Sequence, residues 1–104
     1  MASSSYAVYV SRLALADIDA NFDYMERAYG TSAALDYTIA LAGAIDTLAE
    51  HPRRCALIEP DLSELRRLIH RSHVAYFRIE ARGVLVLRVL HTSRDHEAEL
   101  ASMR

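Results

Sequence analysis

Residues 84–95 read VLVLRVLHTSRD, and this stretch decides the fold of the 104-residue chain. Its first seven residues are apolar apart from Arg88, which is typical of a central strand that is buried on both faces. The stretch turns polar at His91 and stays polar to its end. Such a change at the end of a buried strand indicates either a functional rim or the cap of a following helix.

Both interpretations of the polar end stay open. Thr92 and Asp95 have the spacing of a capping box, and Glu97 and Glu99 would add negative charge to the first turns of a short C-terminal helix. His91 is instead a candidate functional side chain, because an imidazole at the end of a strand contributes only modestly to packing. We therefore expect a short helix after residue 95 and treat the strand end as a candidate rim.

Further strand-like segments accompany this central one. Two segments, residues 65–70 and 73–80, are separated by a short turn. Residues 81–83 form a second short turn between the latter segment and the central strand. These spacings predict an antiparallel meander. Apolar and polar side chains alternate within residues 73–80, which predicts a sheet covered on one face. Residues 6–10 (YAVYV) predict one more strand, able to pair in parallel with the central strand.

Two amphipathic helices are predicted between the first strand and the meander. Ser11 is a good N-cap for the first helix, and Gly30 is a natural stop for it. Thr31 or Ser32 can cap the second helix, which should end just before Pro52. The apolar stripe of the first helix contains Leu15, Ile18, Phe22, Met25 and Tyr29. The buried stripe of the second contains Ala33, Tyr37, Ala40, Leu41, Ala44, Ile45 and Leu48.

Residues 51–64 hold both prolines without sustained periodicity, so we interpret them as a loop with one turn of helix after Asp61. The expected architecture is one α+β domain over residues 1–104. It has an N-terminal strand, an antiparallel helical hairpin packed on a small, mainly antiparallel sheet, and a short C-terminal helix. Without a membrane-length apolar run or a signal-peptide pattern, the sequence predicts a soluble, cytoplasmic protein. Cys55 has no partner for an internal disulfide.

Charge divides the chain into two halves. Residues 1–50 carry seven acids and two arginines, a net charge of −5, whereas residues 51–104 carry ten arginines and seven acids, a net charge of +3. Every basic residue is arginine, which makes planar contacts with phosphate or carboxylate groups. The total of −2 nevertheless argues against a protein that mainly binds a nucleic-acid backbone, and no sequence-specific nucleic-acid binding is expected.

The order of these segments resembles the RelE/ParE toxin superfamily of type II toxin-antitoxin systems, and more closely its ParE-like toxins. Four segments carry the resemblance: YVSRLALADI, LAEHPRR, RIEARGVLVLRVLH and the terminal HTSRD. The resemblance implies a compact α+β domain and a cognate, ParD-like antitoxin whose helix and extended tail lie over the toxin. Ala14, Ile18 and Leu41 are candidate antitoxin contacts in a groove between helix and sheet.

The resemblance implies one of two targets, and the fold does not choose between them. RelE-like toxins are mRNA endonucleases acting inside the ribosome; here His91 would be the acid or base, with Arg78, Arg88 and Arg94 stabilising phosphate charge. ParE-like toxins poison DNA gyrase without nuclease chemistry. The RNA-cleaving relatives often place a tyrosine just beyond the last strand, but no Tyr or Phe follows Phe77. We therefore favour gyrase inhibition without enzymatic activity, and keep mRNA cleavage as the alternative.

On the favoured interpretation, an arginine-rich sheet face and the adjacent rim contact the target. The candidate target-binding residues are Arg66, Arg67, Tyr76, Arg78, Arg88, His91 and Arg94. A non-toxic protein-interaction module remains a further possibility. No cofactor and no metal site are expected, because no Cys or carboxylate completes a ligand spacing with the histidines. Those histidines are His70, His73, His91 and His96.

Overall fold

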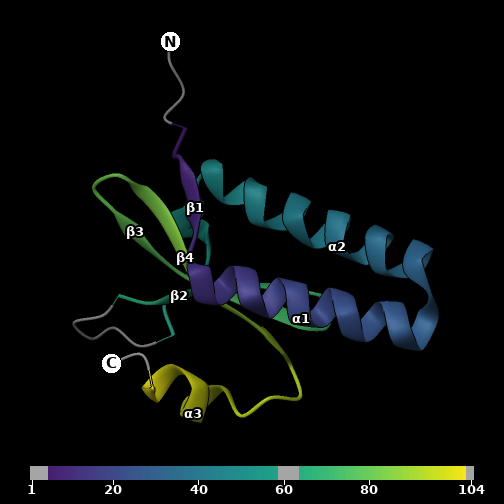
Figure 1. The fold of residues 1–104 in the computed structure, drawn as a ribbon. Helices are drawn as coiled ribbons and strands as arrows, with labels where there is room; N and C mark the ends of the chain where they lie inside the picture. The colour runs from purple at the N-terminus through teal and green to yellow at the C-terminus, as the bar shows by residue number, and fades with distance from the viewer. Residues whose placement is uncertain (1–4, 59–63, 103–104) are drawn as a thin grey trace.

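The computed structural model describes residues 5–58 and 64–102, and within them it confirms the predicted α+β architecture (Figure 1). The predicted helical turn after Asp61 lies outside the described residues. The elements are β1 (Val8–Val10), α1 (Arg12–Tyr29), α2 (Thr31–Asp46), the 3-10 turns η1 (Thr47–Ala49) and η2 (Pro52–Arg54), β2 (Arg66–His70), β3 (His73–Glu80), β4 (Gly83–His91) and α3 (His96–Ala101). In these ranges no helix combines the length and the apolar character that crossing a bilayer requires.

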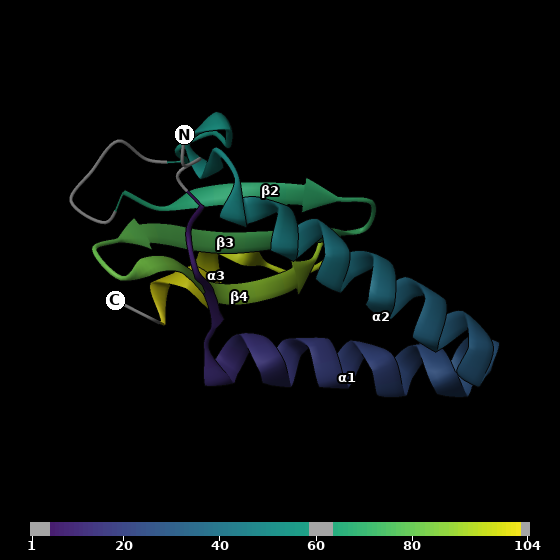
Figure 2. The same ribbon diagram turned by 90° about the horizontal axis from the view of Figure 1, so that it is seen from above.

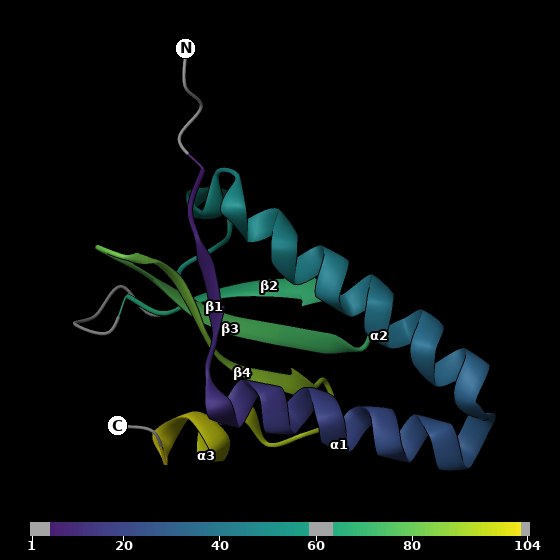
Figure 3. The same ribbon diagram turned by 45° about the horizontal axis from the view of Figure 1, so that its top comes forward.

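The four strands form one mixed sheet in the order β1-β4-β3-β2. The predicted meander is confirmed, because β3 pairs antiparallel with both β2 and β4. The predicted parallel pairing of β1 with β4 is also present. The helices α1 and α2 cover one face of the sheet, and α3 lies on the other side (Figures 2 and 3).

Side chains of the sheet are therefore buried on both faces, although Arg67 and Ile69 of β2 stay exposed on the α3 side. This corrects the expectation of cover on one face only. The core on the hairpin side includes Leu41, Ile45, Leu48, Phe77, Val84 and Val86. The core on the α3 side contains Leu65, Val74, Tyr76, Leu90 and Leu100. Alternation in β3 suggested an open face because Tyr76 counts as polar, whereas its ring packs among these apolar side chains.

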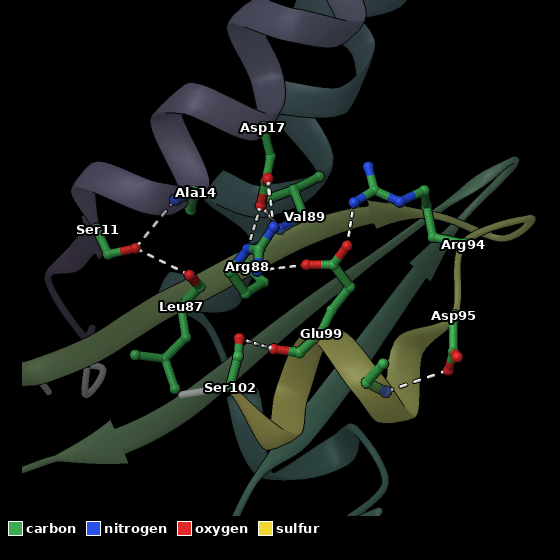
Figure 4. Close-up of polar contacts among 11 residues, drawn as sticks. Ser11, Ala14, Asp17, Leu87, Arg88, Val89, Arg94, Asp95, Glu99 and Ser102 are labelled. Atoms are coloured by element: carbon green, nitrogen blue, oxygen red, sulfur yellow. Dashed lines mark hydrogen bonds and ion pairs between the residues drawn. The ribbon is translucent and has the colours of Figure 1, made fainter. Parts of the chain in front are cut away.

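The start of α1 provides hydrogen-bond partners for the part of the β4 edge that β1 is too short to reach. β1 pairs only with Val84, Leu85 and Val86. Ser11, the predicted N-cap, donates its hydroxyl to the carbonyl of Leu87 (2.9 Å) and accepts from the Ala14 N–H (3.1 Å). The Val89 N–H donates to Asp17 Oδ2 (2.8 Å). Buried backbone groups need hydrogen-bond partners, and these contacts supply them for β4. They thereby attach α1 to the central strand (Figure 4).

Two expectations about the helical hairpin are wrong in detail. Gly30, at φ 96°, ends α1 and is itself the N-cap position of α2, so neither Thr31 nor Ser32 caps that helix. The Thr31 hydroxyl instead donates to Glu26 Oε2 (2.9 Å). The helix α2 also ends earlier than expected. Its regular α-helical part stops at Asp46, and the 3-10 turn η1 follows as far as Ala49.

The buried stripe of α1 is also shifted from the predicted one. Leu15 and Tyr29 are exposed, whereas Ala14 is completely buried against the sheet. A small side chain at position 14 suits the close approach of α1 to β4 that the Ser11 and Asp17 contacts require.

Candidate functional site

A groove of about 470 Å³ lies between α1 and the C-terminal end of β4. The helix contributes Asp17, Ala20, Asn21 and Tyr24, and the sheet and the turn after it contribute His73, Val89, His91, Ser93 and Arg94. We call this feature the rim groove. It contains two of the predicted target-binding residues, His91 and Arg94, so these two are brought together as expected.

His73 forms the inner wall of the rim groove. Its Nδ1 lies 2.6 Å from the Tyr37 hydroxyl, and its ring centroid lies 5.2 Å from that of His91 in an edge-to-face arrangement. Burial, with smaller contributions from His91 and His70, lowers the pKa of His73 to about 4, although Asp17 acts in the opposite direction. His73 is therefore neutral at physiological pH.

His91 is exposed, and the turn after β4 fixes the orientation of its ring. The Ser93 N–H donates to His91 Nδ1 (3.0 Å), and the Ser93 hydroxyl lies 2.8 Å from the same nitrogen. Because Nδ1 accepts these contacts, the neutral imidazole carries its proton on Nε2. His91 thus offers an N–H donor at the rim.

The turn between β4 and α3 contains both a helix cap and exposed side chains at the rim. Asp95 is the N-cap of α3 and accepts from the Ala98 N–H (3.1 Å). The expected capping box beginning at Thr92 is wrong, since Thr92 lies in the turn and its N–H donates to the Ser72 carbonyl (2.8 Å). Arg94 projects from the same turn, pairs with Glu99 and keeps a side chain that is 53% exposed.

Arg88 lies in a buried ion-pair cluster with Asp17 and Glu99 (Figure 4). Its Nε and Nη2 each donate to Asp17 at 2.8 Å, and its Nη1 donates to Glu99 at 3.0 Å. The hydrogen bond with Asp17 raises the pKa of the Arg88 guanidinium, and the pKa of Glu99 is lowered by Arg94 first and by Arg88 second. We call these three residues the Arg88 cluster.

The Arg88 cluster corrects the expectation that Arg88 contacts a target. The residue is only 8% exposed, and each of the Nε, Nη1 and Nη2 groups already binds a carboxylate. Sequence reasoning placed Arg88 on an open sheet face because the cover provided by α3 was not anticipated.

The remaining predicted arginines do not share one face either. Arg66 lies opposite Phe77 on the hairpin side and donates to the carbonyls of Arg53 (3.1 Å) and Cys55 (2.7 Å). Arg67 lies opposite Tyr76, hence on the other side. Arg78 pairs with Glu80 at 3.2 Å.

Tyr76, one of the candidate target-binding residues, is a core residue that is only 5% exposed. Its hydroxyl lies 2.6 Å from His96 Nδ1, and burial raises its pKa, with Arg67 opposing. The other nitrogen of His96, Nε2, donates to the His91 carbonyl (2.7 Å). Tyr76 therefore helps to attach α3 and the rim turn to the sheet.

The candidate antitoxin contacts are largely interior. Ala14 is 0% and Leu41 is 2% exposed, and both belong to the core on the hairpin side, so neither side chain lies at the surface. Ile18 is partly buried against the same core. Large apolar side chains that are exposed include Leu35 and Ile39 of α2.

Sequence reasoning did not assign the other seven residues of the rim groove to the target site, among them Asn21 and Tyr24. The available signal was the position of Asn21 within the apolar stripe of α1, where a polar side chain needs a partner or a function. The histidines are not grouped around one point, because His96 contacts Tyr76 and not His73. Within residues 5–58 and 64–102, no three His, Cys, Asp or Glu side chains are arranged to hold a metal ion.

Comparisons with known proteins agree with this fold. Residues 8–96 match the model of a family described as the ParE toxin of the type II toxin-antitoxin system parDE. The chain is 37% identical over 91 residues to Toxin ParE1 of Caulobacter vibrioides, covering 88% of this chain and 94% of that protein. A solved structure described as a chromosomal ParDE TA system from P. aeruginosa matches with a TM-score of 0.74 and 23% identity, over 86% of this chain and 98% of that one.

Proposed function

The chain belongs to the ParE toxin family of type II toxin-antitoxin systems, and on this premise we propose that it arrests growth by inhibiting DNA gyrase and is neutralised by direct binding of a cognate antitoxin. The two parts of the proposal concern different surfaces. The target is assigned to the rim groove with His91 and Arg94, and the antitoxin to the outer side of α2.

The observation that carries the choice of gyrase over mRNA is that the candidate cations are already paired. Cleavage of RNA without a metal needs cations that stabilise charge developing on the phosphate. Arg88 is held by Asp17, Arg94 by Glu99 and Arg78 by Glu80. Carboxylates beside each guanidinium oppose the approach of a phosphate, which favours a protein contact surface over a nuclease centre.

An in vitro comparison tests this choice. Purified toxin should inhibit gyrase supercoiling of a relaxed plasmid or trap cleaved DNA complexes, and it should leave mRNA intact in a translation extract. Ribosome-dependent cleavage that weakens in His91→Gln, with normal supercoiling at excess toxin, would reverse the assignment. Expression that leaves growth unaffected would instead favour a non-toxic interaction module.

The antitoxin surface is inferred from exposed apolar and acidic residues on α2. Leu35 and Ile39 are one turn apart and exposed, with Ile39 at 67%. Asp36 and Asp46 are exposed on the same helix. Such a surface fits an amphipathic antitoxin helix that carries apolar and basic side chains. The similar P. aeruginosa structure, described as a ParDE TA system, supports the pairing of this fold with an antitoxin.

A charge introduced on α2 tests the antitoxin surface. Ile39→Asp should weaken antitoxin binding by roughly 10-fold or more, because it places a carboxylate in an apolar contact. Gyrase inhibition by the same variant should not change. The matched control is Ala81→Asp, at an exposed position of the turn between β3 and β4. Equal antitoxin affinity of wild type and Ile39→Asp would exclude this surface.

A further inference from the structure

We propose that the rim groove is an anchor site for a carboxylate side chain, Asp or Glu, on the surface of the toxin's target protein. The identity of the target rests on the proposed function, whereas the carboxylate chemistry rests on the groove alone. The inference begins with an amide nitrogen that the fold leaves without a partner.

Asn21 lines the rim groove, and its Nδ2 is buried without a hydrogen-bond partner. Leaving a buried donor unsatisfied costs about 1–3 kcal/mol, so such a group in a folded protein calls for an explanation. If the Asn21 side chain turns toward the groove, an acceptor that enters there supplies the missing partner. Asn21 is thus the first of three donor residues that line the groove.

The other two donors come from the strand end and the turn. His91 presents Nε2–H, because its Nδ1 accepts from Ser93. Arg94 uses one nitrogen for Glu99 and keeps further N–H groups on an exposed side chain. Asn21, His91 and Arg94 therefore surround the groove from three segments of the chain.

The strongest potential acceptor in the groove is already engaged. The Asp17 carboxylate accepts from Arg88 Nε, Arg88 Nη2 and the Val89 N–H. An unpaired amide donor next to a carboxylate that already accepts three hydrogen bonds predicts that the missing group is an acceptor brought by another molecule.

The local charge distinguishes a carboxylate from a phosphate. The carboxylates of Asp17 and Glu99 balance the guanidinium groups of Arg88 and Arg94. One additional negative charge can be held by three donors, whereas a phosphate dianion would meet two nearby carboxylates without a surplus of cations. A carboxylate accepts several N–H donors, and the groove suits it better.

The surroundings of the groove indicate that the carboxylate belongs to a protein. Tyr24 in the groove is 57% exposed, and Leu13 is 55% exposed eleven residues earlier, which places both on the same side of α1 three turns apart. Exposed aromatic and apolar residues beside an arginine are typical of a protein contact surface. They would pack around the anchor residue of the partner.

A direct test uses the only primary amide among the side chains. Asn21 is the only asparagine and the chain contains no glutamine, so ¹⁵N-labelled protein gives one side-chain NH₂ pair. Titration with blocked glutamate, N-acetyl-glutamate N-methylamide, should shift this pair, and blocked glutamine should not. No shift with glutamate, an equal shift with glutamine, or a larger shift with inorganic phosphate would each overturn the proposed chemistry.

A second test asks whether the groove binds the target protein. Asn21→Asp replaces a donor by a negative charge and should weaken binding to gyrase by roughly 10- to 100-fold. Ala81→Asp adds the same charge at an exposed position of the turn between β3 and β4, outside the groove, and should bind as wild type does. Thermal melting verifies that both variants are folded, and Tyr24→Ala, at an exposed position, replaces Asn21→Asp if that variant does not fold.

The outcomes separate the two proposals. If wild-type toxin binds gyrase and folded Asn21→Asp binds equally well, the groove is not the target site. If wild-type toxin does not bind gyrase, the proposed function fails, while the glutamate titration still decides whether the groove takes a carboxylate.

Discussion

Arg88 and Arg94 lie six residues apart and bind the same carboxylate, Glu99, but in very different surroundings. Arg88 is buried between β4, α1 and α3, where two carboxylates engage its guanidinium. Arg94 is exposed at the edge of the rim groove and uses one nitrogen for Glu99. The comparison indicates that the buried arginine holds the fold together, whereas the exposed arginine is available to a partner.

The largest expected difference between the two arginines is in stability. Arg88→Met should lower the free energy of unfolding by roughly 3–5 kcal/mol, because it leaves the largely buried Asp17 carboxylate without its guanidinium partner. Arg94→Met is the matched control and should change it by less than about 1 kcal/mol, since exposed ion pairs contribute little. Urea denaturation measures both variants. An equal effect of the two substitutions would contradict the division of roles.

Acid should affect the inner wall of the rim groove through His73. Its folded-state pKa of about 4 lies below the unfolded value of 6.5, so between these pH values the unfolded chain binds the proton and the folded chain does not. Neutral His73 therefore makes its full contribution to the free energy of unfolding above pH 6.5. This free energy falls by roughly 3 kcal/mol as the pH drops to about 4. The groups facing His73 are His91, His70, Asp17 and the Tyr37 hydroxyl.

Replacing His73 separates its effect on the pH dependence of stability from the effects of the neighbouring groups. His73→Phe should flatten the decline in unfolding free energy between pH 6.5 and 4, when this is followed by urea denaturation at several pH values. His51→Phe, at an exposed position, should keep the wild-type pH dependence. A decline in His73→Phe as steep as in wild type would show that another group is responsible.

A smaller effect is expected at the start of α1. Ser11→Ala removes both the N-cap and the hydroxyl bound to Leu87, and should cost about 1 kcal/mol of unfolding free energy. Ser32→Ala, exposed and not a cap, should be nearly neutral. Thermal or urea denaturation distinguishes the two, and similar losses would argue against Ser11 as the link between α1 and the β4 edge.

Much of the fold could be predicted because local signals agree with it. Ser11 begins α1, Gly30 separates the helices, and the apolar run around Val86 is the central strand. The second sheet cover could not be predicted from periodicity, because α3 is only six residues long and its attachment depends on Leu100 and on the distant Tyr76.

The candidate site was predicted only in part. The polar end of β4 indicated His91 and Arg94, and the structure places both at the rim groove. It did not distinguish Arg88 from them, because a strand arginine has the same sequence signature whether it is paired inside or exposed. Asp17 and Asn21 lie more than sixty residues away along the chain, so their contribution emerges only when α1 packs beside β4.

Inhibition of gyrase supercoiling by Arg94→Met, with its melting temperature recorded on the same preparation, decides whether the rim groove binds the target. We expect this variant to melt as wild type does and to need roughly 10-fold more protein for the same inhibition. Inhibition equal to wild type, by an equally stable protein, would contradict the assignment of the rim groove as the target-binding site.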